Sequence, residues 1–115
     1  MTDESRKSPV SVLICTKNEE RNLGDCLKSV AWADDCTVFD SYSDDQTVKI
    51  AQAEGARVVQ RQFDNFSAHK NWALDHLDFK YDWILIVDAD ERVTPELARE
   101  IAALVSGSPE HHGYY

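Results

Sequence analysis

The sequence predicts an α/β fold: a Rossmann-like, mostly parallel sheet with helices on both faces. Short apolar runs rich in β-branched residues alternate with stretches whose apolar residues recur at helical spacing. Several of the runs are apolar throughout, which is typical of parallel strands covered by helices on both faces. With 115 residues, 43% of them hydrophobic, the chain has the size and composition of one globular domain.

The first half of the chain contains two strand–helix units. Residues 10–15 (VSVLIC) are expected to form a strand, and the apolar residues after it recur at helical spacing. Residues 36–40 (CTVFD) are expected to form the second strand. In the helix that follows, Ser43 or Asp44 is the expected N-cap and Gly55 the expected C-terminal stop.

The second half repeats the pattern. A strand is expected at 56–60 (ARVVQ) and a short amphipathic helix at 67–77 (SAHKNWALDHL). The apolar run at 83–87 (WILIV) predicts a buried strand. The last helix has Thr94 as its expected N-cap, proline at its first position and glycine near its end.

The chain divides into a polar tail, residues 1–9, and one α/β domain, residues 10–115. The two tyrosines at the end resemble the beginning of another strand. We therefore expect the chain to stop partway through a larger fold.

Composition excludes several classes of function. The net charge is −9 and no stripe of basic residues occurs, which disfavours a nucleic-acid or anionic membrane surface. The three cysteines lack zinc-ligand spacing, which indicates reduced thiols in a cytoplasmic protein. No apolar leader or stretch long enough to span a bilayer is seen in the sequence. An anionic ligand would need a local cation.

Polar residues follow three of the expected strands. These are Thr16 to Glu19, Asp40 with Ser41, and Asp88 to Asp90. Ligands of parallel α/β sheets bind outside the carboxyl ends of the strands, so we expect these clusters to meet at one edge.

The acidic cluster has the chemistry of a divalent-cation site. Asp88 and Asp90 are one residue apart at a strand end, and their oxygens suit Mg²⁺ or Mn²⁺ while leaving positions for phosphate oxygens. The alternative is that Asp88, Asp90 and Glu91 form a solvated loop before a helix.

Four motifs together resemble a known family. They are VSVLICTKNEERNL, the Asp-x-x-Ser-x-Asp-x-Thr pattern at Asp40, Ser43, Asp45 and Thr47, FSAHKNWAL, and the Asp-x-Asp of ILIVDADE. In this order they resemble the nucleotide-sugar-dependent glycosyltransferases of family 2, which have the GT-A fold. The resemblance covers Val10 to about Ile101. Within it, parts of these motifs are similar to the bacterial branch that glucosylates the lipopolysaccharide inner core.

The resemblance implies an inverting glycosyltransferase with a nucleotide-diphospho-sugar donor, a UDP-sugar, and Mg²⁺ or Mn²⁺ as cofactor. The acceptor would be a glycan or the lipopolysaccharide core, and the enzyme would be cytoplasmic or peripheral to the inner membrane. The family's catalytic base lies in a later segment, here beyond Tyr115. We therefore expect an incomplete GT-A domain that binds the donor.

The resemblance also assigns roles to residues. Nucleotide-binding roles fall on Thr16, Asn18, Glu19, Asp40, Lys70 and Asp88. Asp40 would face the base, Asp88 would contact the ribose or the metal, and Asp90 would hold the cation. Lys70 stands where the family often has arginine, and would meet the phosphates as a point charge. Lys17 replaces a frequent aromatic residue, so base stacking is not implied there.

Other conspicuous residues have structural explanations. Trp72 and Trp83 lie among apolar residues at element spacing and are expected in the core. Lys70 also fits a solvated surface lysine. Glu96 and Glu100 are expected on the solvated face of the last helix, and neither is nominated as a catalytic base.

Two rival functions remain open. One is a non-catalytic domain that binds nucleotide or associates with itself through an exposed sheet edge. The other is a phosphohydrolase of the haloacid dehalogenase type, although Arg92 stands where that class has threonine or valine. Dinucleotide-binding and P-loop enzymes are disfavoured because neither glycine-rich motif occurs.

Overall fold

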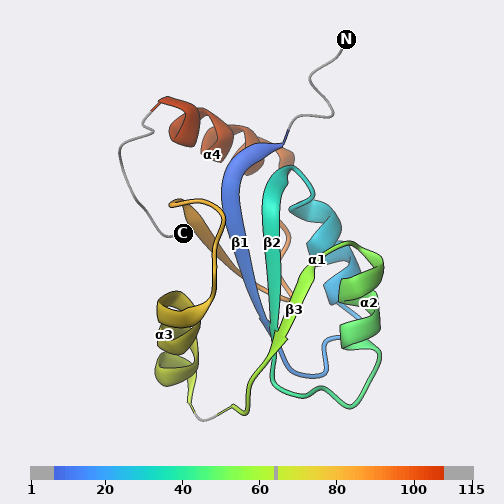
Figure 1. Ribbon diagram of the computed structural model, residues 1–115. Coiled ribbons are helices and arrows are strands. Elements are labelled where there is room, and N and C mark those ends of the chain that lie inside the picture. Colours follow the sequence, from blue (N-terminus) through green and yellow to red (C-terminus); the bar gives the residue numbers. More distant parts are fainter. Residues whose placement is uncertain (1–6, 64, 108–115) are drawn as a thin grey trace.

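The computed structural model describes residues 7–63 and 65–107. Its elements are β1 (Ser8–Thr16), α1 (Leu23–Ser29), β2 (Ala33–Asp40), α2 (Thr47–Ala53), β3 (Arg57–Gln60), α3 (Phe66–His76), β4 (Ile84–Asp88) and α4 (Pro95–Gly107). Strands and helices alternate as the sequence predicts (Figure 1). The expected strand in the C-terminal tail lies outside the described residues.

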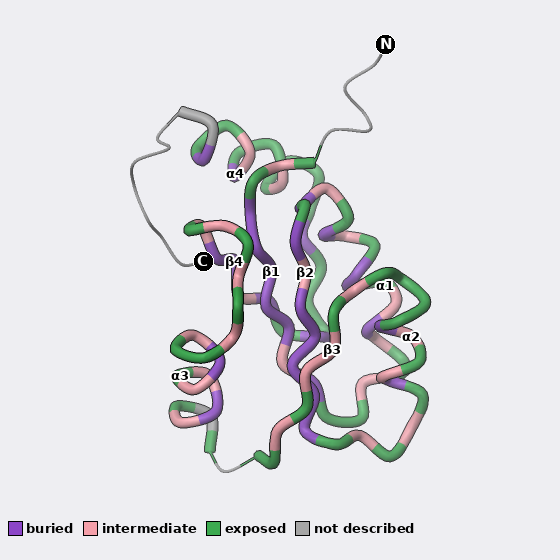
Figure 2. Tube along the Cα trace, viewed as in Figure 1, coloured by how far each residue is buried: buried purple, intermediate pink, exposed green. Residues whose placement is uncertain are grey.

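The described strands form one parallel sheet with the order β3-β2-β1-β4. Buried positions follow β1 and β2 in the middle of the sheet (Figure 2). Among the described strands, β3 and β4 are the edges. Self-association through such an edge stays a prediction.

Helices cover both faces of the sheet, which confirms the predicted class. On one face, Ile14 and Val38 pack in a cluster with residues of α1, α2 and α4. On the other face, Leu13 and Phe39 pack with Ala73 of α3 (Figure 1). Neighbouring strand residues therefore belong to opposite clusters, because successive side chains of a strand point to opposite faces. Both tryptophans predicted in the core are partly buried against these clusters.

Several element boundaries differ from the prediction, and the largest shift among the strands is that of β2, which begins at Ala33, three residues earlier than expected. β1 begins at Ser8, two residues earlier than expected, and pairs there with Ala33. Neither Ser43 nor Asp44 is the N-cap of α2, because Gln46 occupies that position. The hydroxyl of Ser43 instead donates to Asp40, so it is not available to the helix. The C-terminal stop is confirmed: Gly55 has a φ of 84° just after the helix, a conformation that glycine adopts without strain.

The last helix begins as predicted. Thr94 Oγ1 accepts a hydrogen bond from the Leu97 N–H at 3.1 Å, and Pro95 is the first helical residue. The asparagine cap of α3 was not predicted: Asn65 Oδ1 accepts from the Ala68 N–H at 2.8 Å. No helix among the described residues is both long enough and apolar enough to cross a bilayer.

A buried carboxylate ties the strands together at their amino ends. Asp35 accepts hydrogen bonds from Ser11 Oγ at 2.7 Å and from the Lys80 N–H at 3.0 Å, and Arg57 lies 3.2 Å away. Ser11 Oγ in turn accepts from the Tyr81 N–H. These bonds fix the segment that leads into β4, and hence the strand that carries Asp88.

Two leucines near helix starts test the packing. Leu23 in α1 is fully buried, whereas Leu97 in α4 is 41% exposed. We expect Leu23→Ala to lower the free energy of unfolding by about 3 kcal/mol, because it removes buried methyl groups and leaves a cavity. Leu97→Ala should cost less than about 1 kcal/mol. Urea denaturation measures both, and equal losses would contradict the core assignment.

Candidate functional site

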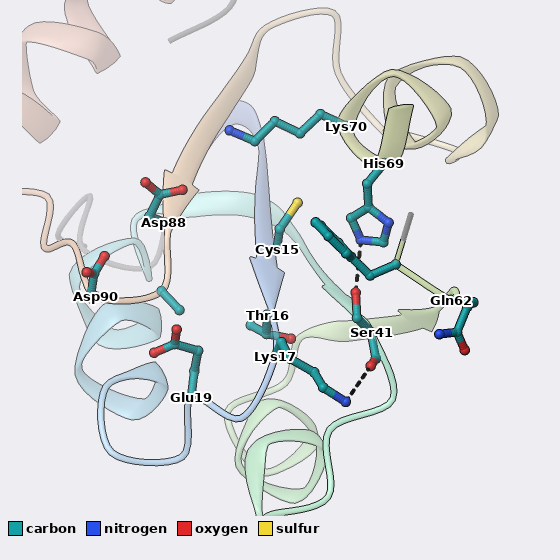
Figure 3. A pocket seen from close by; sticks show the side chains of 12 residues that line it. Cys15, Thr16, Lys17, Glu19, Ser41, Gln62, His69, Lys70, Asp88 and Asp90 are labelled. Carbon is teal, nitrogen blue, oxygen red and sulfur yellow. Dashed lines mark hydrogen bonds between the residues drawn. The ribbon is translucent and has the colours of Figure 1, made fainter. Parts of the chain in front are cut away.

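A cavity of about 570 Å³ lies at the carboxyl ends of β1, β2 and β4. It is lined by Cys15, Thr16, Lys17, Glu19, Ser41, Gln62, Phe63, His69, Lys70, Asp88, Ala89 and Asp90 (Figure 3). All three polar clusters that follow the strands contribute to it. The predicted convergence at one sheet edge is therefore confirmed, and α3 with the loop before it supplies a further wall.

One end of the cavity is acidic. Asp88 and Asp90 are exposed on either side of buried Ala89, and Figure 3 shows Glu19 beside them. A tight turn shapes this end: the Asp88 N–H donates to Glu91 Oε1 at 2.8 Å, and the Glu91 N–H donates to the Asp88 carbonyl at 2.9 Å. Two carboxylates of the turn are thus presented to the cavity.

Arg92 does not neutralise this acidic end. Its guanidinium donates to the carbonyl oxygens of Ala89 and Glu91, and it lies 3.9 Å from the carboxylate of Asp25. Within the described residues, no hydrogen bond to the carboxylate of Asp88 or Asp90 is formed. The negative charge therefore faces solvent and whatever enters the cavity.

Lys70 brings a cation to the same space. Its side chain extends from α3 toward the end of β4 (Figure 3). Burial raises the pKa of the Cys15 thiol to about 11, while Lys70 acts to lower this pKa and Asp88 to raise it. The ammonium and the carboxylate thus both act on the thiol between them. The cavity therefore presents a positive charge, on Lys70, and negative charges, on Asp88 and Asp90. This arrangement suits an anion that binds together with a metal cation.

The acidic end fits a divalent cation held jointly with a ligand. No group of three or more acidic, histidine or cysteine side chains that could hold a metal occurs in the described part of the chain. Mg²⁺ and Mn²⁺ sites that use one or two carboxylates take their remaining oxygens from phosphates and water. Asp88 and Asp90 supply that pair.

The opposite wall is built on Ser41 and aromatic rings. Ser41 Oγ lies 3.2 Å from His69 Nε2, and the ring of His69 stacks on Phe39 with centroids 4.2 Å apart. Trp72 also stacks on Phe39, with ring centroids 5.6 Å apart. Phe63 lines the cavity beside His69 and is 43% exposed. This wall is polar at one point and apolar around it.

Asp40 lies beneath the cavity and not in its lining. Its carboxylate accepts from Thr16 Oγ1 at 2.6 Å, Ser43 Oγ at 2.5 Å, the Ser43 N–H at 2.8 Å and Gln60 Nε2 at 3.1 Å. Burial alone would raise the pKa of Asp40, but these hydrogen bonds outweigh it and hold the pKa below its usual value. In this arrangement both oxygens accept hydrogen bonds from the protein itself. The contact of Asp40 with a base stays a prediction.

Asn18 is likewise outside the cavity lining. Its N–H donates to Ser43 Oγ at 2.8 Å, and its side-chain oxygen accepts from the Asp44 N–H at 2.8 Å. Its φ is 55°, in the left-handed region that asparagine tolerates. Asn18 therefore joins the loop after β1 to the loop after β2. Its role in binding a nucleotide stays a prediction.

The rest of the Asp-x-x-Ser-x-Asp-x-Thr motif continues this junction. The Glu19 N–H donates to Thr47 Oγ1 at 2.9 Å, and the Glu20 N–H donates to Asp45 Oδ2 at 3.2 Å. Thr47 also donates to Asp45. The motif thus locks two adjacent loops together, and so positions the residues that do line the cavity.

Sequence reasoning missed several residues of the site. Gln62, Phe63 and His69 were assigned no role, although His69 lies within the FSAHKNWAL motif. They reach the cavity because β3 and α3 bring them back to the sheet edge. Lys17 was noted as the substitute for an aromatic residue. Its ammonium donates to the carbonyls of Ser41 and Tyr42 at 3.1 and 2.9 Å, so it braces the loop after β2.

The buried carboxylate of Asp40 makes the free energy of unfolding depend on pH. Because the pKa of Asp40 is lowered on folding, its stabilising effect is complete above the unfolded value of about 4 and is lost as the pH falls through the lower folded value. We expect Asp40→Asn to lower the free energy of unfolding at pH 7 by about 2 kcal/mol. The difference from wild type should shrink below pH 4.

Urea denaturation from pH 7 to pH 2.5 measures this difference. Asp44→Asn, at an exposed neighbouring position, is the control and should change stability at pH 7 by less than about 0.5 kcal/mol. A deficit in Asp40→Asn that stays constant across the whole pH range would contradict the role of the charge.

Comparison with known proteins gives the family. The profile of a family described as glycosyl transferase family 2 matches residues 11–110. The chain is 41% identical over 93 residues to an uncharacterized glycosyltransferase of Rickettsia bellii, an alignment that covers 80% of the chain and 31% of that relative. It is 28% identical over 113 residues to the lipopolysaccharide core biosynthesis glycosyltransferase LpsC of Rhizobium meliloti, covering 94% of the chain and 41% of LpsC.

A solved structure shows the same architecture. Glucosyl-3-phosphoglycerate synthase from Mycobacterium tuberculosis, in complex with Mn²⁺, UDP-glucose and phosphoglyceric acid, superposes with a TM-score of 0.57 at 25% identity. The match covers 76% of this chain and 34% of that one. The chain thus spans between about a third and two fifths of the length of each of these three proteins. Its fold is of the GT-A type, and the match of the profile to residues 11–110 shows that the chain belongs to glycosyl transferase family 2.

Proposed function

We propose that the chain is the donor-binding part of an inverting glycosyltransferase that uses a UDP-sugar, in the cytoplasm, for lipopolysaccharide-core or other envelope polysaccharide synthesis. The observation that carries the proposal is the cavity itself, with exposed Asp88 and Asp90 and the ammonium of Lys70 at the carboxyl ends of the strands. The name of LpsC supports the acceptor class, and the ligands of the mycobacterial enzyme support the donor and Mn²⁺.

The roles of the residues follow from charge. A diphosphate is an anion that would be repelled by a chain of net charge −9 unless cations meet it. Lys70 supplies one positive charge, and Asp88 with Asp90 would hold Mg²⁺ or Mn²⁺ against the phosphates. The bound cation supplies Lewis-acid stabilisation of the negative charge that develops on the departing nucleoside diphosphate.

The acceptor also needs a base that removes the proton of its hydroxyl. Glu96 and Glu100 are exposed on α4 and do not line the cavity, so neither is assigned this role. We propose that a further segment, corresponding to the part of the relatives that this chain does not match, supplies the base and the acceptor site. In that scheme residues 10–115 bind the donor and do not complete the transfer.

The metal role is tested with Asp90. We expect UDP to bind in the presence of Mn²⁺, and Asp90→Ala to weaken that binding at least about tenfold, because one of two cation ligands is lost. Glu96→Ala, an exposed carboxylate outside the cavity, should bind as wild type does. Calorimetric titration with UDP and GDP, with and without Mn²⁺, measures this. Unchanged metal-dependent binding by Asp90→Ala would contradict the site.

Lys70 gives a separate test of the phosphate contact. We expect Lys70→Ala to weaken UDP binding by about 10- to 100-fold, the effect of a charge-assisted hydrogen bond, and Lys70→Arg to retain it. Uridine, which lacks phosphates, should bind both variants equally. Lys49→Ala on the exposed face of α2 is the matched control. If Lys70→Ala binds UDP as tightly as the control does, Lys70 is only a surface lysine.

A further inference from the structure

The turn after β4 is closed by Glu91, the residue that follows the two aspartates of the cavity. The Asp88 N–H donates to Glu91 Oε1 at 2.8 Å, and the Glu91 N–H donates to the Asp88 carbonyl at 2.9 Å. Each residue thus satisfies a main-chain group of the other, as the two residues of a helix capping box do. The two bonds close a ring over residues 88–91 and restrict the main chain inside it.

The same segment is anchored to the core on both sides of the exposed carboxylates. Ala89 and Val93 are buried and pack in the apolar cluster that contains residues of α1. The Val93 N–H donates to Ser29 Oγ of α1 at 3.0 Å, and Cys26 Sγ of the same helix lies 3.6 Å from the Asp88 carbonyl. The turn is therefore held against α1 at its beginning and just beyond its end.

The three acidic side chains of the turn are used differently. Asp88 and Asp90 line the cavity, and Figure 3 shows both carboxylates at the same end of it. Glu91 does not line the cavity, and its Oε1 is engaged with the main chain of Asp88. One carboxylate therefore bonds within the turn, whereas the other two are presented to a ligand.

We propose that Glu91 is a positioning residue for the cation site, and that it directs the carboxylates of Asp88 and Asp90 toward one ion. The inference rests on the proposed function, in which those two side chains hold Mg²⁺ or Mn²⁺. Asp88 is the last residue of β4 and Asp90 lies in the turn, so the turn sets the direction of one carboxylate relative to the other. Ligands that are oriented before the ion arrives lose less conformational freedom on binding.

The test compares two neutral variants of similar side-chain length. Glu91→Gln keeps an oxygen that accepts from the Asp88 N–H, whereas Glu91→Met lacks a strong acceptor. In calorimetric titration of the whole chain with UDP and Mn²⁺, Glu91→Met should bind about tenfold more weakly than Glu91→Gln, the usual effect of losing a group that orients metal ligands. Glu91→Gln should stay within about threefold of wild type, because an exposed charge that does not touch the ion contributes little.

Two controls accompany this comparison. Glu96→Met removes an exposed carboxylate outside the cavity and should bind UDP as wild type does. Uridine has no phosphates to meet the cation, so its affinity should be the same in both Glu91 variants. A parallel loss of uridine binding in Glu91→Met would indicate a general change of the cavity and would overturn the positioning role.

The remaining outcomes separate this inference from the proposed function. Equal losses of UDP affinity in Glu91→Gln and Glu91→Met would show that the charge acts and not the acceptor oxygen, which would overturn the inference. Wild-type affinity in Glu91→Met, together with weakened binding by Asp90→Ala, would overturn the inference and leave the proposed function intact. A wild-type chain without Mn²⁺-dependent UDP binding would overturn both.

Discussion

The site depends on the buried carboxylate of Asp40. It lies at the end of β2, opposite Thr16 at the end of β1. It accepts hydrogen bonds from the Thr16 hydroxyl, from the N–H and hydroxyl of Ser43, and from the side-chain amide of Gln60 at the end of β3. One side chain thus joins the ends of three neighbouring strands. A buried charge is tolerated only when such bonds replace its hydration, so each partner is constrained to a single position.

This constraint extends to the cavity. Ser43, which is bonded to Asp40, accepts a hydrogen bond from the N–H of Asn18. The N–H groups of the next two residues donate to Thr47 and Asp45, so the loops after β1 and β2 are locked together. Ser41 directly follows Asp40, the last residue of β2, so its position is fixed by the hydrogen bonds of Asp40. The cavity walls are therefore strand ends and braced loops, which hold functional groups more rigidly than free loops do. The carboxylates of Asp88 and Asp90, by contrast, remain open to a ligand or cation.

Much of the fold was predictable because local patterns agree with the tertiary structure. The apolar run at 83–87 and the Thr94–Pro95 start of α4 carry strong signals, and both elements form where expected. The predicted N-cap of α2 was wrong. Serine often caps helices, but here the hydroxyl of Ser43 donates to Asp40 at the end of β2. His69 and Phe63 were not assigned to the site because nothing in a single sequence shows which face of a helix or loop meets the cavity.

The sequence by itself determined the parallel α/β class, the family resemblance and the sheet edge at which polar residues gather. These follow from periodicity and from the rule that parallel strands end together. Only the tertiary structure decided which polar residues bond within the fold and which line the cavity. Asp40 and Asn18 became internal connectors, whereas Ser41 and His69 became part of the wall. The reason is that hydrogen-bond partners 20 or more residues apart in sequence, such as Thr16 and Asp40 or Ser41 and His69, are chosen by packing and not by local pattern.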